Sequence, residues 1–337
     1  MLFSLLRRLC WVVFLIVCAL IMLWAAGALC FDLPVNRLFR NLIAVLFVIT
    51  VAFFGIFGKG RIRMIPLFLT GLIAIWWLTL KPSNQRNWKS EVSQTAWAEI
   101  HGDEVTLHNV RNLDYRTESD FTPAWENRTV RLSQLTGIDM AINYWGSPYM
   151  AHPIVSFQFA DSPPLCFSIE TRMENGEAYS AIGGIYRQYE LVYVVADERD
   201  VVRVRTNYRK GEDVYLYRLL LSPDQAKGRF LEYIQTINQL KDTPRWYNAI
   251  TNNCTTSIRG QHEKAKRRPW DWRILVNGFG DEMLYEQGGI RSGGLPFSEL
   301  KNQSRINEVA KAAGSDLDFS RLIRLNAPSF KAESPAH

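Results

Sequence analysis

Three apolar stretches in the first eighty residues constrain the fold of this chain more than any other feature. They cover residues 9–31, 41–58 and 64–80, and none of them holds an ionisable group other than a cysteine thiol. Each stretch approaches the roughly 20 apolar residues that a helix needs to cross a bilayer. The sequence therefore predicts a membrane region of three helical spans over residues 1–80.

Basic residues beside these spans predict their orientation. Arg7 and Arg8 precede the first span, and three further basic residues occupy positions 59–63, between the second and third spans. Because loops rich in Lys and Arg stay in the cytoplasm, residues 81–337 are expected on the other side of the membrane. The first span also resembles a cleavable signal peptide, but its removal would leave the rest of the chain on the same side.

The charge of the chain resides in its membrane region. The formal net charge is +6, and residues 1–80 hold seven basic residues and one acidic residue, which leaves 32 of each sign in the remainder. An extracytoplasmic domain of zero net charge, whose longest basic stretch is "KAKRR", argues against a nucleic-acid partner.

Alternating apolar and polar residues predict a β-rich domain after the membrane region. Two such runs meet at Gly102-Asp103, which is a hairpin signal. Pairing of consecutive strands through short turns is typical of antiparallel sheets, so we expect a substantial, mostly antiparallel sheet. Further strand candidates cover residues 128–135, 138–145, 152–160, 164–171, 190–197 and 213–220.

Helical patterns interrupt these strands, so the predicted fold class is α+β. Residues 222–242 carry a capping box of Ser222 and Gln225 with a proline at the first position. Residues 176–189 can form another helix. A third helix is expected from near Asn253 to about Lys266, capped by Thr251 or Asn252.

The resulting organisation has four parts. Residues 1–80 form the membrane region, 81–95 a polar linker and 96–290 the extracytoplasmic domain. Residues 291–337 are expected to form a polar C-terminal helix followed by a flexible tail.

Cys254 is the strongest candidate for a reactive group. It lies in the polar stretch "NNCTTSIR" and at the expected start of a helix, where amide dipoles lower the pKa of a thiol and can bind an oxyanion. Cys166 lies in an apolar strand candidate and is interpreted as a small core residue. A disulfide between Cys166 and Cys254 is the alternative in an oxidising compartment.

A reactive thiol needs a base, and His152 is the best placed of the histidines. It opens a strand candidate, whereas His262 lies roughly 12 Å along the same helix as Cys254 and His337 lies in the tail. His101 and His108 fall in the N-terminal hairpin and are interpreted as solvated strand residues.

The next strand candidate offers a group to orient the His152 ring. Ser168 and Glu170 share one face of that strand by alternation, so Glu170 is predicted as the third member of the site. A structural ion pair of Glu170 with Arg172 or Arg187 is the alternative.

Four motifs resemble the extracytoplasmic domain of the lipoprotein intramolecular transacylase family, Lnb. They are "AHPIVSFQF", "DVYLYRL", "YNAITNNCTTSIR" and the long block over residues 167–209, and the resemblance runs from about Trp97 to Gly289. It implies a permuted NlpC/P60-like, papain-related fold in which the histidine strand precedes the cysteine helix. It also implies that Cys254 and His152 form a catalytic pair.

The activity that this resemblance implies is acyl transfer on lipoproteins. The sn-2 acyl chain of a diacylglyceryl lipoprotein would pass through a Cys254 thioester to the amine of the lipoprotein's N-terminal cysteine. Membrane lipid and lipoprotein are thus the expected partners. The protein would be a multi-pass protein of the bacterial inner membrane, with its domain in the periplasm.

Six further residues complete the expected site. Asn253 and Thr255 flank the cysteine, and Arg205 and Arg209 would clamp a phosphate or carboxylate unless they form ion pairs with residues 196–200. Trp270 and Trp272, with Phe279 and Leu284, would line an apolar mouth unless they are ordinary core residues.

Two other functions remain open at this point. A Cys-His pair also attacks amides, so an amidase or peptidase acting on peptidoglycan is one, and a non-catalytic membrane-tethered module is the other. Neither paired histidines at ligand spacing nor a glycine-rich phosphate loop occurs in the sequence, so no metal or cofactor is expected.

Overall fold

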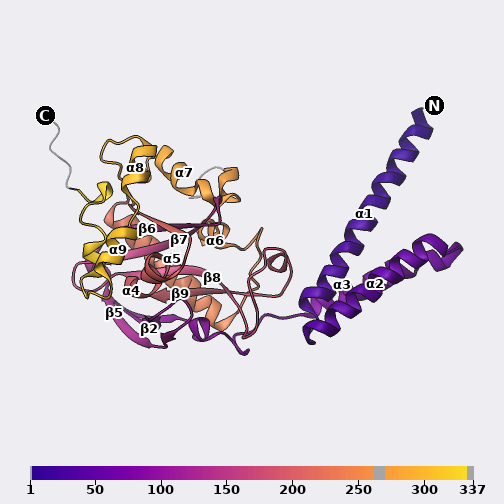
Figure 1. Ribbon diagram of the computed structural model, residues 1–337, viewed down its shortest axis with the longest axis horizontal. Coiled ribbons are helices and arrows are strands. Elements are labelled where there is room, and N and C mark those ends of the chain that lie inside the picture. The colour runs from indigo at the N-terminus through magenta and orange to yellow at the C-terminus, as the bar shows by residue number, and fades with distance from the viewer. Residues whose placement is uncertain (1, 262–269, 332–337) are drawn as a thin grey trace. The chain divides into compact units, whose positions relative to one another are not determined.

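The computed structural model describes residues 2–261 and 270–331, and Figure 1 labels their helices and strands. The chain divides into two compact units. The first, here called the membrane unit, combines Met1–Ser83 with Ala178–Glu190 and Trp246–Ala249. The second, here called the sheet unit, contains the remaining residues.

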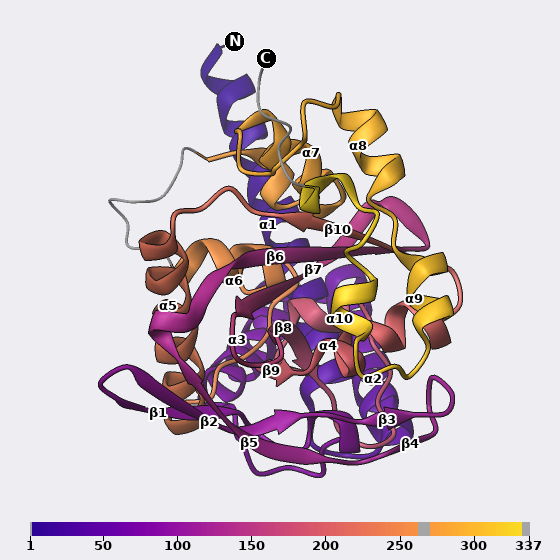
Figure 2. The same ribbon diagram turned by 90° about the vertical axis from the view of Figure 1, so that its left-hand side faces the viewer.

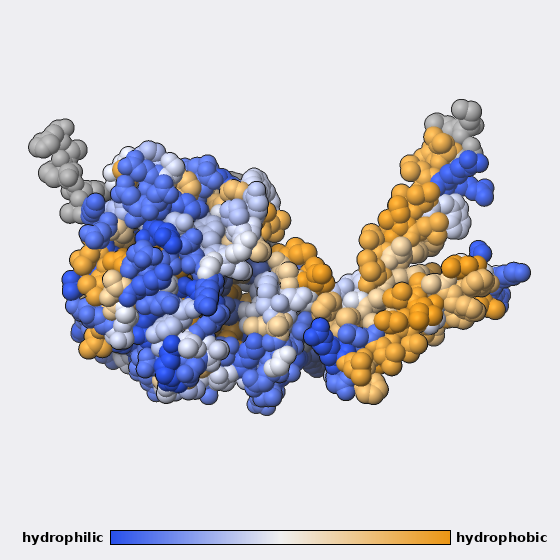
Figure 3. Space-filling model, in the orientation of Figure 1, coloured by the Kyte–Doolittle hydropathy of each residue, from blue (hydrophilic) through white to orange (hydrophobic). Residues whose placement is uncertain are grey.

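Three apolar helices dominate the membrane unit. They are α1 (Leu2–Asp32), α2 (Arg37–Phe57) and α3 (Ile65–Thr79), and α3 is preceded by the 3₁₀ turn η1 (Gly60–Met64). All three are long and apolar enough to cross a membrane. Their large apolar side chains are mostly exposed, as the orange surface of these helices in Figure 3 shows, which is the pattern of helices that face lipid. They correspond to the three predicted spans.

Asp32 and Arg187 join the end of α1 to the end of α3 within the membrane unit. The Asp32 carboxylate accepts hydrogen bonds from the Trp77 indole (2.6 Å) and from the backbone N–H of Arg187 (3.0 Å). The Arg187 guanidinium lies 3.8 Å from the centroid of the Trp77 ring and donates to the carbonyls of Trp77 and Leu80. These contacts hold the segment Ala178–Glu190 with the membrane helices.

The helix predicted over residues 176–189 is wrong. The segment is irregular apart from one 3₁₀ turn, η4 (Gly183–Ile185), because its backbone pairs with a distant part of the chain. Ala249 donates its N–H to the carbonyl of Gly184 (2.7 Å). A Cβ on Gly184 would lie 3.2 Å from the Tyr247 ring, so glycine permits this close approach.

The sheet unit is built on an eight-stranded, mostly antiparallel sheet, as predicted. The strand order is β1-β2-β9-β8-β7-β6-β10, with β5 paired to β2. Gly102, with a φ of 64°, turns the predicted hairpin between β1 and β2. The strands of this sheet are β1 (Trp97–His101), β2 (Glu104–Arg111), β5 (Trp125–Arg131), β6 (Leu135–Trp145), β7 (Ser147–Phe159), β8 (Leu165–Arg172), β9 (Glu190–Ala196) and β10 (Glu212–Arg218), and β3 (Asp114–Tyr115) and β4 (Phe121–Thr122) form a separate pair.

Helix α5 (Pro223–Asp242) covers one face of this sheet. The predicted capping box of Ser222 and Gln225 is confirmed. Phe230 packs against the ring of Phe157 with centroids 5.0 Å apart, and Tyr233 packs against Phe167 at 5.1 Å. Aromatic contacts in edge-to-face geometry of this kind stabilise a core beyond their buried area.

Short helices cover the opposite face, as Figure 2 shows with α5 on one side of the sheet and α9 and α10 on the other. This core includes Ile154, Cys166 and Val194 from the strands. Ile306, Ala310 and Phe319 of the C-terminal segment pack against it. The helical elements here are α4 (Glu198–Val201), the π-helix η5 (Val204–Tyr208), α9 (Asn307–Ala313) and α10 (Phe319–Leu322).

The C-terminal segment therefore differs from the predicted polar helix and tail. It contains three short helices, α8 (Phe297–Gln303), α9 and α10, and Pro328 and Ser329 are buried. The few apolar residues of this polar segment are the ones that pack in the core. A prediction from overall composition misses them because polar residues dominate the segment. The rest of the predicted tail, residues 332–337, lies outside the described residues.

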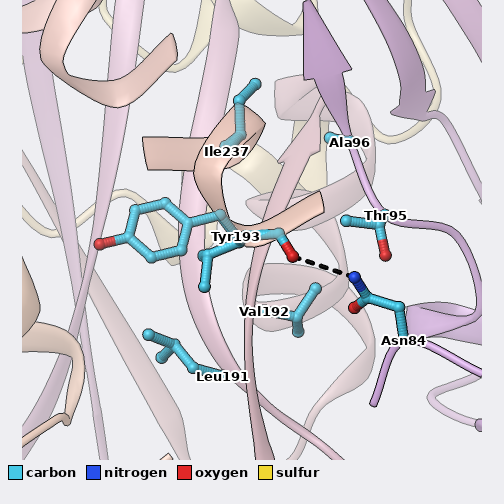
Figure 4. A pocket seen from close by; sticks show the side chains of 8 residues that line it. Asn84, Thr95, Ala96, Leu191, Val192, Tyr193 and Ile237 are labelled. Carbon is cyan, nitrogen blue, oxygen red and sulfur yellow. Dashed lines mark hydrogen bonds between the residues drawn. The ribbon is translucent and has the colours of Figure 1, made fainter. Parts of the chain in front are cut away.

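The expected polar linker is likewise folded onto the sheet unit from Asn84 onward. Asn84 donates a hydrogen bond to the Leu240 carbonyl (2.9 Å) in a small crevice that Figure 4 shows. Trp88 and Val92 are buried, and the Arg172 guanidinium lies 4.6 Å from the centroid of the Trp88 ring. Cation–π and backbone contacts thus order a segment whose composition is polar.

Arg324 ties the C-terminal segment to buried carboxylates of the sheet unit. Its guanidinium donates to Asp139 of β6 (2.8 Å) and to Glu198 of α4 (2.8 Å), and both carboxylates are fully buried. Removing one partner of such a cluster leaves buried charge uncompensated.

We expect Arg324→Ala to destabilise the full-length protein by about 3–5 kcal/mol, because Asp139 and Glu198 lose a buried counter-charge. Arg321→Ala is the control, since its exposed pair with Asp318 (2.9 Å) is worth about 0–1 kcal/mol. Urea unfolding of the detergent-solubilised protein measures both. Equal destabilisation by the two substitutions would contradict the role of Arg324.

Candidate active site

Cys254 is the first residue of helix α6 (Cys254–Gln261), and its side chain is buried, at 7% exposure. Asn253 caps this helix: its side-chain oxygen accepts the Thr256 N–H (2.9 Å), and its own N–H donates to the Thr256 hydroxyl (2.9 Å). This reciprocal cap fixes the start of the helix at the cysteine. The predicted cap by Thr251 or Asn252 is therefore wrong, and residues 262–266 of the predicted helix lie outside the described chain.

His152 lies on β7 and is hydrogen-bonded to the Cys254 sulfur. Its ring is buried, and Nε2 lies 2.7 Å from the Ser168 hydroxyl and 3.2 Å from the Glu170 carboxylate. Since both of these partners engage Nε2, the other ring nitrogen, Nδ1, is available to the sulfur. Cys254 and His152, which are 102 positions apart in the sequence, thus form one pair.

Glu170 and Ser168, on the neighbouring strand β8, contact the Nε2 side of the His152 ring. The Glu170 carboxylate accepts a hydrogen bond from the Ser168 hydroxyl (2.6 Å) and one from the Arg205 guanidinium (2.9 Å). Arg205 comes from the π-helix η5 and also lies 3.4 Å from Glu212. The structural ion pairs of Glu170 with Arg172 or Arg187, considered from the sequence, are replaced by the pair with Arg205.

The charges of this cluster favour an ion pair between sulfur and imidazole. Burial lowers the pKa of His152, but the Glu170 charge and the hydrogen bond to Cys254 outweigh burial and the repulsion from Arg205, so the pKa rises to about 9. Burial raises the pKa of the Cys254 thiol, but the hydrogen bond and charge of His152 bring the pKa below its usual value. Burial also raises the pKa of Glu170, and His152 and Arg205 hold it well below its usual range. A thiolate facing an imidazolium is the nucleophilic form of such a pair.

The two arginines predicted to clamp a substrate anion are engaged by protein carboxylates. The Arg205 side chain is only 6% exposed and pairs with Glu170 and Glu212. It therefore contacts the site through Glu170. Arg209 lies 3.4 Å from Glu212 and 3.7 Å from Glu118. Arg205 and Arg209 thus form ion pairs, but with Glu170, Glu212 and Glu118 and not with the carboxylates of residues 196–200 that the sequence suggested.

The aromatic and apolar residues predicted to line a mouth divide into two groups. Trp270 and Trp272 are 60% and 58% exposed, and Trp272 contacts Phe279 at a centroid distance of 5.5 Å. Phe279 contacts Tyr149 at 5.8 Å. The core interpretation is therefore wrong for both tryptophans, whereas Leu284 packs against the buried cluster around Ile142 and Leu300.

Asn277 is a site residue that the sequence did not reveal. It begins the 3₁₀ turn η8 (Asn277–Phe279), and its side-chain nitrogen lies 3.6 Å from the Cys254 sulfur. In the sequence it reads as an ordinary Asn-Gly turn signal, and nothing in its spacing connects it with Cys254. Thr255, predicted to contact substrate, has its hydroxyl 3.8 Å from the same sulfur.

The remaining candidates occupy other environments. His101 is largely exposed, as expected for a solvated strand residue. The same interpretation is wrong for His108, whose side chain is only 20% exposed and stacks on Trp97 at 3.9 Å. His262 and His337 lie outside the described residues. Cys166 and Cys254 are free thiols, and Cys166 is fully buried.

Within residues 2–261 and 270–331, no group of three or more metal-ligating side chains converges.

The fold and the site together define a membrane-anchored α+β protein that presents a buried Cys-His pair. Residues 121–278 match the family model described as the Lnb N-terminal periplasmic domain. This part of the chain is therefore similar to the periplasmic domain of the Lnb family, and the similarity supports a lipoprotein-modifying role on the periplasmic side of a membrane. The matched range is narrower than the span from Trp97 to Gly289 expected from the motifs.

No curated protein and no solved structure matches the chain. The permuted NlpC/P60-like relationship consequently stays a prediction, whereas the α+β class and the mostly antiparallel sheet are confirmed.

We expect iodoacetamide to alkylate Cys254 below the pH at which an ordinary thiol ionises, because His152 stays protonated up to about pH 9 and holds the thiolate. Glu170→Gln removes the charge that raises the pKa of His152, so the thiolate forms at higher pH and the alkylation midpoint moves upward. His152→Ala moves it further, since burial then acts on the thiol alone.

The alkylation rate is followed by mass spectrometry of the Cys254 peptide across a pH series. Glu99→Gln, which removes an exposed carboxylate beside His101, is the matched control and leaves the midpoint in place. The same midpoint in the wild type and in both site variants would refute the ion pair.

Proposed function

We propose that this protein is a thiol-dependent acyltransferase of the inner membrane that acts on lipoproteins from the periplasmic side. The acyl chain moves from the lipid of a diacylglyceryl lipoprotein, through a thioester on Cys254, to the amine of the lipoprotein's N-terminal cysteine. The observation that carries this proposal is the Cys254–His152 hydrogen bond backed by Glu170.

The first half of the reaction acylates the enzyme. The Cys254 thiolate attacks the ester carbonyl of the lipid, and a carbon–sulfur bond forms while the carbonyl oxygen becomes an oxyanion. Collapse of this intermediate breaks the carbon–oxygen bond of the ester. The departing glycerol oxygen takes the proton of the His152 imidazolium, so the products are a lyso-lipoprotein and a Cys254 thioester.

The second half transfers the acyl group to nitrogen. The lipoprotein's amine attacks the thioester carbonyl, and neutral His152 accepts the proton that the amine loses. The carbon–sulfur bond then breaks, which restores the thiolate–imidazolium pair and leaves an N-acylated lyso-lipoprotein. No oxidant, metal or nucleotide enters this balance.

Glu170 and Arg205 are positioning residues in this scheme. Glu170 holds the Nε2 side of the His152 ring at 3.2 Å, together with the Ser168 hydroxyl at 2.7 Å. Arg205, at 2.9 Å, keeps the Glu170 carboxylate ionised and fixed. An orienting group of this kind sets which ring nitrogen meets the nucleophile.

The exposed aromatic and apolar residues near the nucleophile support an acyl substrate over a peptide. Trp272, Phe279 and Tyr149 form a continuous set of ring contacts, and Phe279 is in the same short turn as Asn277, which touches the sulfur. Met150 and Leu275 add exposed apolar surface. Such residues can bind an alkyl chain and exclude the water that would hydrolyse a thioester.

The membrane helices supply the setting for a lipid-linked substrate. Three apolar helices anchor the chain, and residues Trp246–Ala249 belong to the same compact unit as those helices. Only four residues of chain separate Ala249 from Cys254. The proposed nucleophile thus follows a segment of the membrane unit closely in the sequence.

We expect cells that express the wild-type protein to contain lyso-form lipoproteins with an N-acylated terminal cysteine, because the acyl chain has moved within the lipid anchor. Cells with Cys254→Ala keep the free-amine diacylglyceryl form, and His152→Ala lowers conversion by about 10²–10⁴-fold. Mass spectrometry of lipoprotein N-termini measures both. Unchanged N-termini together with cleaved peptidoglycan stem peptides would replace the proposal by an amidase.

We also expect Trp272→Ala to lower kcat/KM for a long-chain ester by about tenfold and to spare a short-chain ester, because only the longer chain reaches the indole. Acylation of purified protein by a matched C16 and C4 ester pair measures this. Leu317→Ala removes a different exposed apolar side chain and serves as the control. An equal loss for both esters would show that Trp272 acts on folding instead of chain binding.

A further inference from the structure

The side-chain amide of Asn277 is held in one orientation beside the nucleophile. Its oxygen accepts the backbone N–H of Ala151 (2.9 Å), which is the residue before His152 on β7. Since an amide oxygen is an acceptor and the amide nitrogen is a donor, this bond directs the NH₂ group to the Cys254 sulfur, 3.6 Å away. The donor thus faces the place where a substrate carbonyl would react.

The turn that carries Asn277 is fixed against β7 by close packing. A Cβ on Gly278 would lie 2.1 Å from the Pro148 carbonyl oxygen and 2.6 Å from the Tyr149 Cα. Any larger residue at 278 would push the turn away from the strand. Glycine is therefore required here by contact with backbone atoms, which do not move aside as a flexible side chain does.

Two further hydrogen bonds hold the same turn from the other side. The Tyr144 hydroxyl donates to the Gly278 carbonyl (3.0 Å), and the Lys301 ammonium donates to the Tyr144 oxygen (2.9 Å). Lys301 also pairs with the buried carboxylate of Asp281 (3.0 Å). The supports come from β6, from α8 and from the chain directly after the turn, so the position of the Asn277 amide is set by several elements together.

We infer that Asn277 is an oxyanion-binding residue of this site: its amide NH₂ donates to the oxygen of the acyl carbonyl that Cys254 attacks. This inference rests on the proposed acyl-transfer function. From 3.6 Å beside the sulfur, the nitrogen can come within about 2.7–3.1 Å of an oxygen on the attacked carbon, which is the distance that oxyanion donors keep.

The start of α6 supplies the second half of such a site. Cys254 is the first residue of this eight-residue helix, and N–H groups in the first turn of a helix point along the axis without intrahelical partners. A side-chain amide from η8 and the backbone at the start of α6 then meet the oxyanion together. Both half-reactions form an oxyanion on the same carbon, so Asn277 serves acylation and transfer alike.

A donor to an oxyanion differs measurably from a donor that only solvates the thiolate. Alkylation by iodoacetamide occurs at a saturated carbon and forms no oxyanion, whereas acylation by an ester forms one. Loss of an oxyanion donor lowers the rate of an acyl-transfer step by about 10²–10³-fold. The two reactions of one sulfur therefore separate the two roles.

The experiment compares Asn277→Ala and Asn277→Asp with the wild type in the full-length, detergent-solubilised protein. The aspartate has the shape of asparagine and keeps an acceptor for Ala151, but it has no N–H donor. The acylation rate of Cys254 by a C16 ester is measured by mass spectrometry. The alkylation rate by iodoacetamide is measured at a pH at which the thiol of each variant is fully ionised.

We expect both variants to lose about 10²–10³-fold in acylation and to keep alkylation within about threefold of the wild type. Asn175→Ala, which removes an exposed asparagine bonded to Asn87 and Trp88, leaves both rates unchanged. Gly278→Ala repeats the selective loss, because the added Cβ displaces the turn. Tyr144→Phe gives a smaller loss of the same kind.

Three outcomes overturn the inference. Acylation within about threefold of the wild type would remove Asn277 from the chemistry. A parallel fall of alkylation and acylation would assign the amide to the sulfur and not to the oxyanion. If the wild-type protein accepts an acyl group from neither an ester nor a diacylglyceryl lipopeptide, the proposed function itself fails, and the oxyanion role falls with it.

Discussion

The hydrogen bond between the Cys254 sulfur and His152 is the interaction on which the proposed chemistry of this protein depends. A buried thiol would otherwise stay protonated, because burial alone raises its pKa. The pKa of His152 is raised by Glu170, 3.2 Å from its ring, and by the hydrogen bond to Cys254. Glu170 is held in turn by Arg205. Cys254, the proposed nucleophile, is therefore the end of a chain of charges of alternating sign that runs through His152 and Glu170 to Arg205.

This chain of charges draws on elements that are far apart in the sequence. The histidine comes from β7, the carboxylate from β8, the guanidinium from η5 and the sulfur from α6, and η8 adds the Asn277 amide. The C-terminal segment contributes indirectly. Lys301 donates a hydrogen bond to Tyr144, which supports the Asn277 turn, and Arg324 donates one to Asp139 of the sheet. Packing of the whole unit is thus what brings the side chains of Asn277, His152 and Cys254 within contact.

The membrane unit has hydrogen bonds of its own. Asp32 and Arg187 hold the segment Ala178–Glu190 at the ends of the membrane helices, and that segment pairs with Trp246–Ala249 directly ahead of the cysteine helix. The long central block shared with the Lnb family therefore contains residues of two kinds. Arg205 forms an ion pair with Glu170 of the candidate site, whereas Arg187 donates hydrogen bonds to the end of membrane helix α3.

The sequence by itself determined the three apolar helices and the β-rich domain, and it predicted the orientation of the helices and the candidates Cys254, His152 and Glu170. These follow from local signals: apolar length, charge asymmetry, two-residue alternation and a polar cysteine at a helix start. Only the tertiary structure decided that Arg205 pairs with Glu170, that residues 176–189 form a loop and that the C-terminal segment belongs to the core. Asn277 shows the reason most clearly, since its 3.6 Å approach to the sulfur depends on a turn locked against β7, and such long-range packing leaves no periodicity for a local pattern to detect.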